Sequence, residues 1–348
     1  MPVQPNLLER LLFFQLNQAP APLLDLAGAL AYQALAAAAE LDLFQALSEG
    51  PMEPTELAAR LESDERGILA LLQALEATGY VENKGSRYAN SSATEKWLVG
   101  ESVFDMASAA RYWSAMISEM LPQAAEFIRT GRRPYRFYDW VEAEPDLAAA
   151  FQRMMVTNAT LTGDTIAKKV DLPPPAGRLL DVGGGHGAFS IIFCQRYPKL
   201  RATILDSPVT LNTARERVVQ HGLAGRIELV EGDMWQIPWG EGYDCVLLFN
   251  LLHHFDLDTN KKLLAYAAGA LNPGGKVAIL EQVEGRVNGA ASNAFVRLIA
   301  LQYYLFADGR VYSAGEIGRL LTESGFSSPG FHSLTKAPGS TLAVAIKE

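Results

Sequence analysis

Hydrophobic positions recur at two different spacings along the chain, and the change falls about midway. In the first half, apolar residues follow the spacing of amphipathic helices, most clearly over residues 23–47. Two shorter helices are predicted, one that starts at Pro54 and Thr55 in the run 51–61 and one over 64–79. Two short extended runs then meet at Lys84–Gly85, which predicts a hairpin, and further helices follow it. Three helices followed by a hairpin is the element order of a winged helix.

From residue 177 onward, short apolar strands alternate with amphipathic helices. Such alternation is typical of a parallel sheet covered on both faces, so we predict an α/β fold with a doubly wound, Rossmann-like sheet. The last two extended runs, at 330–336 and 341–348, are separated by a turn at Pro338–Gly339 and predict an antiparallel edge. The other strands are predicted over 178–184, 201–206, 226–233, 243–252 and 276–283, and the helices over 187–198, 209–222, 259–271 and 313–325.

Three consecutive prolines, Pro173 to Pro175, separate the two patterns, and proline cannot continue a helix. We therefore predict a second domain at 173–348, after a helical domain at 1–100 and connecting helices at 101–172. A chain of 348 residues, 49% of them hydrophobic, is long enough for two domains with sizeable cores.

Charge and cysteine content narrow the classes of partner and compartment. The formal net charge of -9 disfavours binding to nucleic acid or to an anionic membrane surface. Cys194 and Cys245 lie in apolar surroundings, which is typical of reduced thiols in the core of a cytoplasmic protein. The first residues lack a basic leader and a cleavage signature, and no uninterrupted apolar run reaches the roughly 18 residues of a membrane span. We therefore expect a cytoplasmic protein with no nucleic-acid or membrane partner.

Glycines cluster where the first predicted strand ends, in LLDVGGGHGAF. Gly183, Gly185 and Gly187 would allow a tight turn and let a ligand lie against the backbone. The run Gly183-x-Gly185-x-x-Ala188, with Asp206 further on, also fits the fingerprint of a dinucleotide site. The glycines alone therefore leave a nicotinamide cofactor open.

Three other features favour a cationic nucleoside ligand over a dinucleotide. Asp181 would repel a pyrophosphate at the loop, but it suits a positively charged ligand, held directly or through water. After the third strand, Asp233 can accept a hydrogen bond from an adenine amino group while Met234 packs on the ring. The run LNPGG at 271–275 makes a turn before the next strand.

These motifs resemble those of the class I S-adenosylmethionine-dependent methyltransferases. The winged-helix first half and the ordered series LLDVGGGHG, LDSP, GDMW, LLHHF, LNPGG and YSAGEIGRLLTESGF are similar, over most of the chain, to the small-molecule O-methyltransferases of the plant caffeic-acid type and their bacterial relatives in secondary metabolism. The resemblance implies S-adenosyl-L-methionine as cofactor, S-adenosyl-L-homocysteine as its product, and no metal. It also implies a homodimer formed through the N-terminal domain, with connecting helices that line the acceptor pocket.

The same resemblance assigns individual residues to the cofactor. It implies that Asp206 binds the ribose hydroxyls and that Asp233 and Met234 contact the adenine. The full set of expected cofactor contacts is Asp181, Gly183, Gly185, Asp206, Asp233, Met234 and Asn250.

Two adjacent histidines, His253 and His254, follow the fourth strand in a chain that has only five. In the family a histidine at this point deprotonates the acceptor hydroxyl, and the match falls on His253, although a register one residue later is open. A metal site with Asp256 and Asp258 and a purely structural pair are the other interpretations, and either aspartate can cap the next helix. Because adjacent residues leaving a strand point in opposite directions, we expect only one histidine to face the acceptor.

In the family, carboxylates orient the catalytic histidine or bind the acceptor. Glu281 stands at the position of one such acid, so His253 and Glu281 are the predicted catalytic residues. The second family acid is replaced by Val311, and Glu316 is expected to be structural. This departure leaves methylation of carbon or nitrogen open beside methylation of a hydroxyl.

The acceptor pocket is expected to suit a flat, apolar molecule such as an aromatic or polyketide-like metabolite. Its candidate residues are aromatic, methionine-rich and spaced as on helices, a pattern that core packing explains equally well. The candidates are Trp113, Met154, Met155, Phe295, Leu298, Gln302 and Tyr303.

A winged helix can also belong to a transcriptional regulator that senses a ligand. The helix that would read DNA, at 64–79, has Arg66 as its only basic residue among three acids. DNA binding requires Lys and Arg to neutralise phosphates. We therefore expect the winged helix to serve dimerisation rather than DNA binding.

Overall fold

The computed structural model describes residues 5–99, 106–132, 137–173, 177–286, 289–337 and 339–348. The chain divides into two compact units, Met1–Pro122 with Val141–Thr157, and Gln123–Trp140 with Asn158–Glu348. The predicted junction falls partly outside the described residues, since it includes Pro174 and Pro175. The three-part division at residues 100 and 172 stays a prediction.

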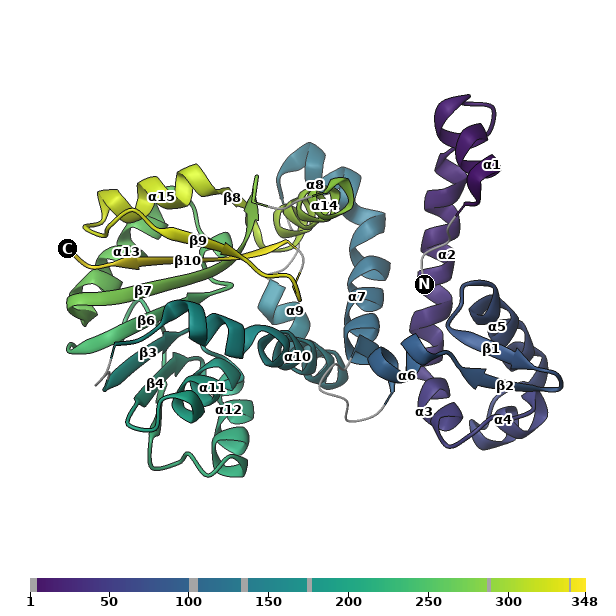
Figure 1. Cartoon of the computed structure of the whole chain (residues 1–348), viewed down its shortest axis with the longest axis horizontal. Coiled ribbons are helices and arrows are strands. Elements are labelled where there is room, and N and C mark those ends of the chain that lie inside the picture. The colour runs from purple at the N-terminus through teal and green to yellow at the C-terminus, as the bar shows by residue number, and fades with distance from the viewer. Residues whose placement is uncertain (1–4, 100–105, 133–136, 174–176, 287–288, 338) are drawn as a thin grey trace. The chain divides into compact units, whose positions relative to one another are not determined.

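The first unit has the predicted order of helices followed by a hairpin (Figure 1). The predicted helix over 23–47 is interrupted, because Asp42 takes a left-handed conformation with φ +54° between two helices. The fully buried Phe44, Leu57 and Leu72 form the centre of its core. The elements are α1 (Leu7–Arg10), η1 (Leu11–Gln15), α2 (Pro22–Glu40), α3 (Leu43–Ser48), α4 (Pro54–Arg60), α5 (Glu65–Ala77), β1 (Val81–Lys84), β2 (Arg87–Asn90), α6 (Ser92–Leu98) and α7 (Met106–Met120).

The second unit contains an eight-stranded sheet in the order β5-β4-β3-β6-β7-β10-β9, with β8 paired to β7. The strands β3 to β7 are parallel to one another, whereas β10 is antiparallel to both β7 and β9. The predicted α/β class and antiparallel edge are therefore confirmed. The strands are β3 (Arg178–Val182), β4 (Arg201–Asp206), β5 (Ile227–Glu231), β6 (Tyr243–Phe249), β7 (Leu271–Glu284), β8 (Tyr312–Ser313), β9 (Gly330–Ser333) and β10 (Ser340–Ile346).

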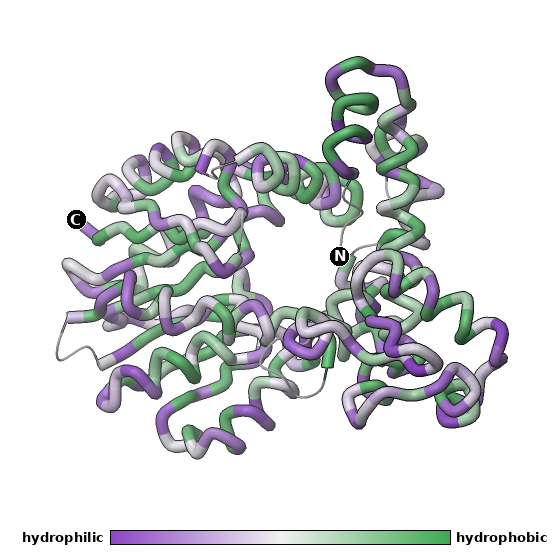
Figure 2. Tube along the Cα trace, turned by 45° about the vertical axis from the view of Figure 1, so that its right-hand side comes forward, coloured by the Kyte–Doolittle hydropathy of each residue, from purple (hydrophilic) through white to green (hydrophobic). Residues whose placement is uncertain are grey.

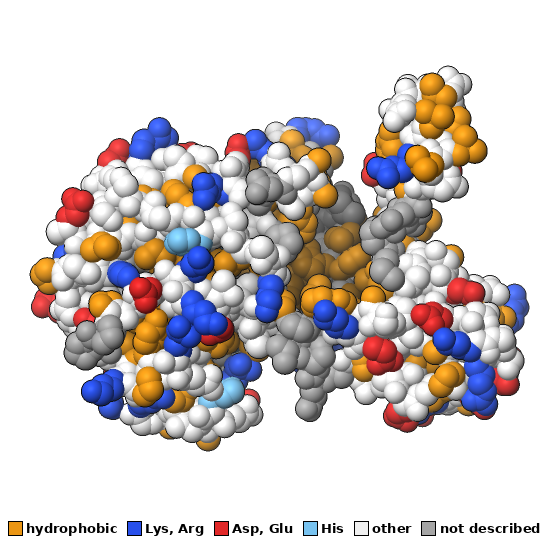
Figure 3. Space-filling model, in the orientation of Figure 1, with side chains coloured by type: hydrophobic (Ala, Val, Ile, Leu, Met, Phe, Trp, Pro, Cys, Tyr) orange, Lys and Arg blue, Asp and Glu red, His pale blue; other side chains and the backbone are white. Residues whose placement is uncertain are grey.

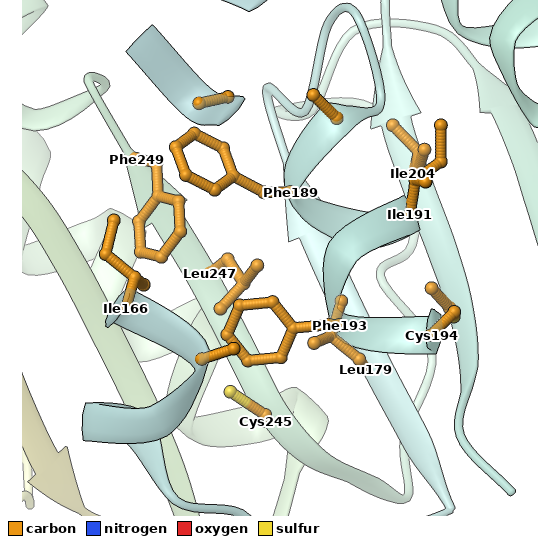
Figure 4. Close-up of a cluster of buried hydrophobic side chains, with 14 of the residues drawn as sticks. Ile166, Leu179, Phe189, Ile191, Phe193, Cys194, Ile204, Cys245, Leu247 and Phe249 are labelled. Atoms are coloured by element: carbon orange, nitrogen blue, oxygen red, sulfur yellow. The ribbon is translucent and has the colours of Figure 1, made fainter. Parts of the chain in front are cut away.

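Helices cover both faces of this sheet (Figure 1), and each face has its own core. On one face Phe189, Phe193 and Phe249 pack around Leu247 (Figure 4), with the rings of Phe189 and Phe249 4.7 Å apart. Cys194 and Cys245 are buried, unpaired thiols of this core, as predicted. The remaining elements are η2 (Leu121–Gln123), α8 (Ala124–Thr130), α9 (Phe137–Ala143), α10 (Pro145–Val170), α11 (Ala188–Arg196), α12 (Pro208–Gln220), η3 (Leu252–His254), α13 (Leu257–Ala270), α14 (Ala290–Ala307) and α15 (Ala314–Glu323).

Four features of the second unit were not predicted from the sequence. The helix α14 and the short strand β8 were not expected, and β7 begins at Leu271, within the predicted LNPGG turn. The fourth strand ends at Phe249, earlier than predicted, because Asn250 has a positive φ of 52°. The two histidines therefore lie on the 3-10 turn η3 and not on a strand.

The N-terminal helices expose a large apolar surface. Leu7 is 89% exposed, the chain of α1, η1 and the start of α2 is largely hydrophobic (Figure 2), and hydrophobic side chains gather on this lobe (Figure 3). Among the described residues, α2 has the length and composition that would allow it to cross a membrane, although the sequence showed no uninterrupted apolar run of that length. The exposed apolar residues of this surface are Leu7, Leu8, Leu11, Phe14, Leu16, Leu23, Leu26 and Leu30.

Candidate active site

The glycine loop connects β3 to α11 at the carboxyl end of the sheet. Gly183, Gly185 and Gly187 have positive φ angles of 68°, 48° and 71°, which side chains other than glycine rarely adopt. Asp206 ends the neighbouring strand β4 and accepts hydrogen bonds from the Gly185 N–H (2.8 Å, Oδ2) and the Ser207 N–H (2.6 Å, Oδ1). The structure therefore brings Asp206 against the loop, and its predicted contact with the ribose stays a prediction.

A carboxylate in this position can also bind a ribose. It can accept about four hydrogen bonds, and two backbone amides hold it in one orientation. Ribose hydroxyls are donors that match it. The residue types at the loop therefore fit an adenosyl cofactor.

The predicted adenine contacts lie on the turn after β5. Asp233 is exposed, and its carboxylate accepts hydrogen bonds from the Trp235 N–H (2.9 Å) and the Gln236 side-chain amide (3.1 Å). Met234 is half-buried against the core on one face of the sheet. Asn250 donates its N–H to the Leu280 carbonyl (2.8 Å) and lies just before the 3-10 turn η3.

Asp181 lies beneath the glycine loop and is only 1% exposed. Its Oδ2 accepts a hydrogen bond from the Ser190 hydroxyl at 2.7 Å. Burial raises the pKa of Asp181 to about 7, the Ser190 bond opposes this rise, and the nearby Asp206 adds to it. The carboxyl group is thus part of the packed floor of the loop, where a positive charge above it would favour the ionised form.

The raised pKa makes stability depend on pH. Between about pH 4 and pH 7 the folded state keeps the proton on Asp181, whereas the unfolded chain has lost it. The contribution of this carboxyl group to the free energy of unfolding therefore falls as pH rises. Asp181→Asn lacks this titration, so relative to wild type the variant is expected to gain stability over this window, by up to about 4 kcal/mol. Calorimetric unfolding of both proteins without cofactor from pH 5 to 8 measures the difference. Parallel stability curves for the two proteins would contradict it.

His186 is a residue of the glycine loop that the sequence did not single out. It is buried, and its Nδ1 accepts a hydrogen bond from the Ala188 N–H at 3.0 Å. Burial, followed by the nearby Arg217, lowers the pKa of His186 to about 3, so the imidazole is neutral. The position of His186 inside the glycine motif was the only signal in the sequence that it belongs to this loop. Spacing along the chain cannot show that its neutral ring accepts a hydrogen bond from the first residue of α11.

The predicted catalytic pair, His253 and Glu281, is formed. The His253 Nδ1 lies 2.7 Å from Glu281 Oε2, and the two side chains are almost fully buried. Glu281 Oε1 also accepts hydrogen bonds from the backbone N–H groups of Leu252 (2.8 Å) and His253 (3.4 Å). Because a carboxylate oxygen accepts here, the proton of the neutral imidazole is placed on Nδ1, and Nε2 is the nitrogen that can act as a base.

Several buried groups hold the turn that carries His253. Asn260, which is fully buried, donates its side-chain amide to the carbonyls of Leu252 (3.0 Å) and Phe255 (3.3 Å). The Arg310 N–H donates to the His253 carbonyl at 3.0 Å. A Cβ at Gly309 would lie 2.4 Å from that carbonyl oxygen, so glycine is required for this close approach. Neither Asn260 nor Gly309 was singled out from the sequence as a residue that supports this turn.

The expectation that the two histidines point in opposite directions is wrong, because they do not leave a strand. On the 3-10 turn their rings lie 4.1 Å apart at 47°. Their partners distinguish them instead, since His254 Nε2 lies 3.2 Å from the Tyr138 hydroxyl of α9. Burial and the neighbouring His253 hold the pKa of His254 well below its usual range.

The acids around the pair have separate roles. Asp256 caps α13 by accepting a hydrogen bond from the Thr259 N–H at 2.8 Å, as one of the two predicted caps. Glu316 forms a capping box with Ser313 and pairs with Arg310, in agreement with its expected structural role. Val311, at the position of the second family acid, is an apolar residue that is 9% exposed. Among the described residues, no group of three or more His, Cys, Asp or Glu could hold a metal ion.

The predicted pocket residues divide between the two units, so their assembly into one pocket stays a prediction. In the first unit Trp113 and Met155 are half-buried and Met154 is buried. On α14 of the second unit, Phe295 and Leu298 are exposed, whereas Gln302 is half-buried. Tyr303 is half-buried and stacks on the His253 ring.

The strand order, the glycine loop after β3 and the acid at the end of β4 define the fold of a class I methyltransferase. The O-methyltransferase domain matches residues 112–327, and the O-methyltransferase dimerisation domain matches residues 24–100, which include most of α2. The chain therefore belongs to the S-adenosylmethionine-dependent O-methyltransferase family, and the predicted enzyme class and cofactor are confirmed at this level. The roles of individual site residues stay predictions.

The similarity to known proteins extends over most of the chain. The 3-hydroxy-5-methyl-1-naphthoate 3-O-methyltransferase of Streptomyces sahachiroi is 32% identical over 89% of this chain and 93% of its own length. The mitomycin biosynthesis 6-O-methyltransferase of Streptomyces lavendulae is 28% identical over 86% of both chains. In fold, the human N-acetylserotonin methyltransferase in complex with S-adenosylmethionine has a TM-score of 0.82 at 21% identity, and covers 100% of this chain and 99% of its own.

Proposed function

We propose that this protein transfers a methyl group from S-adenosylmethionine to a hydroxyl of a small aromatic or polyketide-like metabolite, with His253 as general base. The observation that carries this proposal is the buried His253–Glu281 pair, in which Nδ1 of the imidazole is bound to the carboxylate. His253 follows β6, the strand next to β3, and β3 leads into the glycine loop. The two relatives named above, which act on a naphthoate and in mitomycin biosynthesis, support an aromatic natural product as acceptor.

When bound, the cofactor would supply a methyl group on a sulfonium, and S-adenosylhomocysteine would be the leaving group as that methyl group passes to the acceptor oxygen. This chain's residues position the acceptor oxygen and remove its proton. His253 accepts that proton at Nε2 as the oxygen attacks, and Glu281 stabilises the resulting imidazolium through the bond to Nδ1. Phenols have a pKa near 10, so a positioned imidazole is needed to make the oxygen nucleophilic near neutral pH.

We further propose that the cofactor is held by the residues around the glycine loop. Gly183 and Gly185 offer backbone to the ligand, and Asp206 binds the ribose. Asp181 lies at the base of the loop, and Asn250 lies beside the turn that carries His253. Asp233 would have to exchange its bond to the Gln236 amide for one to the adenine, with Met234 against the ring. We also propose that the protein is a cytoplasmic homodimer that uses no metal and binds no nucleic acid or membrane.

The central test is transfer of labelled methyl from S-adenosylmethionine to a panel of phenols and hydroxynaphthoates. Nuclear magnetic resonance of the product distinguishes a methoxy group from a methyl group on carbon. Formation of a methoxy product supports the proposal. Cofactor binding without transfer to any hydroxyl, but with transfer to carbon or nitrogen, would contradict it.

Methylation of carbon is the second candidate, and Val311 favours it. Attack by carbon depends more on positioning than on a base, and this chain lacks the second family acid. The L-tyrosine C(3)-methyltransferase of Streptomyces lavendulae is 27% identical over 87% of this chain. The intact His253–Glu281 pair favours the hydroxyl acceptor over this alternative.

Asp206→Ala is expected to weaken binding of S-adenosylmethionine tenfold or more. Losing a charged hydrogen-bond acceptor costs on the order of 1.5 to 3 kcal/mol, which corresponds to about tenfold to a hundredfold in affinity. Titration calorimetry with S-adenosylhomocysteine measures the loss, and Asp206→Asn, which keeps an acceptor oxygen, serves as the matched control. Unchanged affinity in the alanine variant would remove this residue from the cofactor site, and tight binding of NAD would overturn the cofactor assignment.

The protein is expected to be a dimer whose interface includes the apolar N-terminal surface. Burying exposed leucines such as Leu7 and Leu8 is favourable, because each removes apolar area from water. Light scattering is expected to report twice the chain mass of 37.8 kDa, and deletion of residues 1–20 should weaken the dimer while the catalytic unit still binds S-adenosylhomocysteine. A monomer at micromolar concentration would rule out this interface.

A further inference from the structure

The imidazole of His253 has a flat aromatic contact besides its bond to Glu281. The Tyr303 ring of α14 stacks on it, with centroids 4.1 Å apart and an interplanar angle of 9°. The Tyr303 hydroxyl donates to Gln282 Oε1 (2.5 Å), and the Gln282 amide donates to Ser340 Oγ (3.2 Å). The stacked ring is therefore anchored to β7 and β10, beside the strand position that carries Glu281.

The backbones of the two stacked residues are joined as well. The Gly309 N–H donates to the Tyr303 carbonyl at 3.0 Å, and the next residue, Arg310, donates its N–H to the His253 carbonyl at 3.0 Å. Two consecutive amides of one loop thus bind the end of α14 and the catalytic turn. This connection holds the backbones of the two residues together independently of their side chains.

One hydrogen bond is insufficient to fix the plane of an imidazole. The bond to Glu281 directs the Nδ1–H, but the ring can still rotate about that bond and swing Nε2 away from the acceptor. The family's second acid is replaced by Val311, whose side chain offers no hydrogen bond. A rigid ring lying parallel to the imidazole restricts this rotation, because tilting would break the stack.

We propose that Tyr303 is a positioning residue that holds the His253 imidazole in the plane in which Nε2 meets the acceptor hydroxyl. This inference rests on the proposed role of His253 as base. Stacking also has a second effect, because an aromatic face attracts a cation and therefore stabilises the imidazolium formed after proton transfer. Tyr303 thus acts through His253 and not by binding the acceptor.

Kinetics of Tyr303→Leu and Tyr303→Phe test the proposal with an accepted phenol. Tyr303→Leu is expected to lower kcat about tenfold, the loss expected for an aromatic pair, with little change in the KM for either substrate. The acidic limb of the kcat–pH profile should move to lower pH, because the imidazolium loses its aromatic contact. Tyr303→Phe keeps the stack and should restore both the rate and the profile to near wild type. Tyr304→Leu, on the next position of α14, is the matched control and should leave the acidic limb in place.

A double-mutant cycle separates the role of Tyr303 from the role of His253. In a His253→Gln background, Tyr303→Leu should cause no further loss of kcat, because the residue acts through the imidazole. Tyr303→Met, of similar length but without a ring, replaces the leucine variant if the latter does not fold, as judged by melting temperature and S-adenosylhomocysteine affinity.

Each outcome bears on one proposal. A raised acceptor KM with unchanged kcat and pH profile would make Tyr303 a wall of the acceptor pocket and overturn the positioning role. A further tenfold loss in the His253→Gln background would also overturn it. If His253→Gln itself turns over at the wild-type rate, the proposed base is wrong. If His253→Gln is inactive but Tyr303→Leu is unchanged, only the role of Tyr303 is wrong.

Discussion

His253→Gln is expected to lower kcat by about 100- to 10,000-fold, the contribution of a general base, while affinity for S-adenosylhomocysteine stays near that of wild type. Glutamine is similar in length and polar, but it cannot take a proton near neutral pH. The imidazole is placed for this role because Glu281 holds Nδ1 at 2.7 Å. Steady-state kinetics with an accepted phenol, together with calorimetry for the cofactor product, measure the two effects.

His254→Ala is the matched control for this substitution. His254 bonds to the Tyr138 hydroxyl through Nε2, so its loss is expected to lower stability by roughly 1 kcal/mol and to leave most of the rate. If His254→Ala is inactive and His253→Ala turns over normally, the base is one residue later. If neither variant changes the rate, methyl transfer proceeds by positioning, and carbon or nitrogen becomes the better acceptor.

The pH dependence of the wild-type rate also distinguishes His253 from His254 as the base. The rate is expected to rise with pH as the base loses its proton, and variants without the base should not show this rise. Burial and the neighbouring His253 keep the pKa of His254 well below its usual range, so His254 is neutral across the rise and cannot cause it.

Glu281→Gln is expected to reduce kcat by about 100- to 10,000-fold through the wrong imidazole tautomer. The carboxylate accepts from the Leu252 N–H with one oxygen and binds His253 Nδ1 with the other. Glutamine has one acceptor oxygen, so if that oxygen keeps the backbone bond, its NH₂ faces Nδ1. The imidazole must then accept at Nδ1 and carry its proton on Nε2, where a base needs an empty site.

The measurement for Glu281→Gln is kcat alongside melting temperature. Glu281→Leu is a harsher variant, because it leaves the buried backbone donor without a partner and costs about 1 to 3 kcal/mol of stability. A rate loss in the glutamine variant with little loss of stability would indicate a role in orienting the base. Wild-type turnover in Glu281→Gln would show that the carboxylate is structural only.

Local patterns were sufficient to predict most of the elements and their order. Period-2 and helical spacing predicted the strands and most helices of the catalytic unit, because one face or both faces of each element are buried and the apolar residues must repeat accordingly. Elements that depend on distant contacts were missed. The strand β8 exists only because Tyr312 and Ser313 pair with the end of β7. The break at Asp42 depends on a left-handed backbone conformation in an otherwise continuous helical pattern.

The sequence by itself determined the fold class, the glycine loop and the acid at the end of β4, because motif order along parallel strands decides which side chains reach the same edge of the sheet. Its resemblance to the family also named His253 and Glu281 as the candidate catalytic residues. Only the tertiary structure decided the roles around that pair. Asn250, with its positive φ, ends β6 early and turns both histidines onto a 3-10 turn, which no alternation rule predicts. Tyr303 and Tyr138 reach the two imidazoles from helices far away in the chain, and such contacts depend on packing and not on spacing.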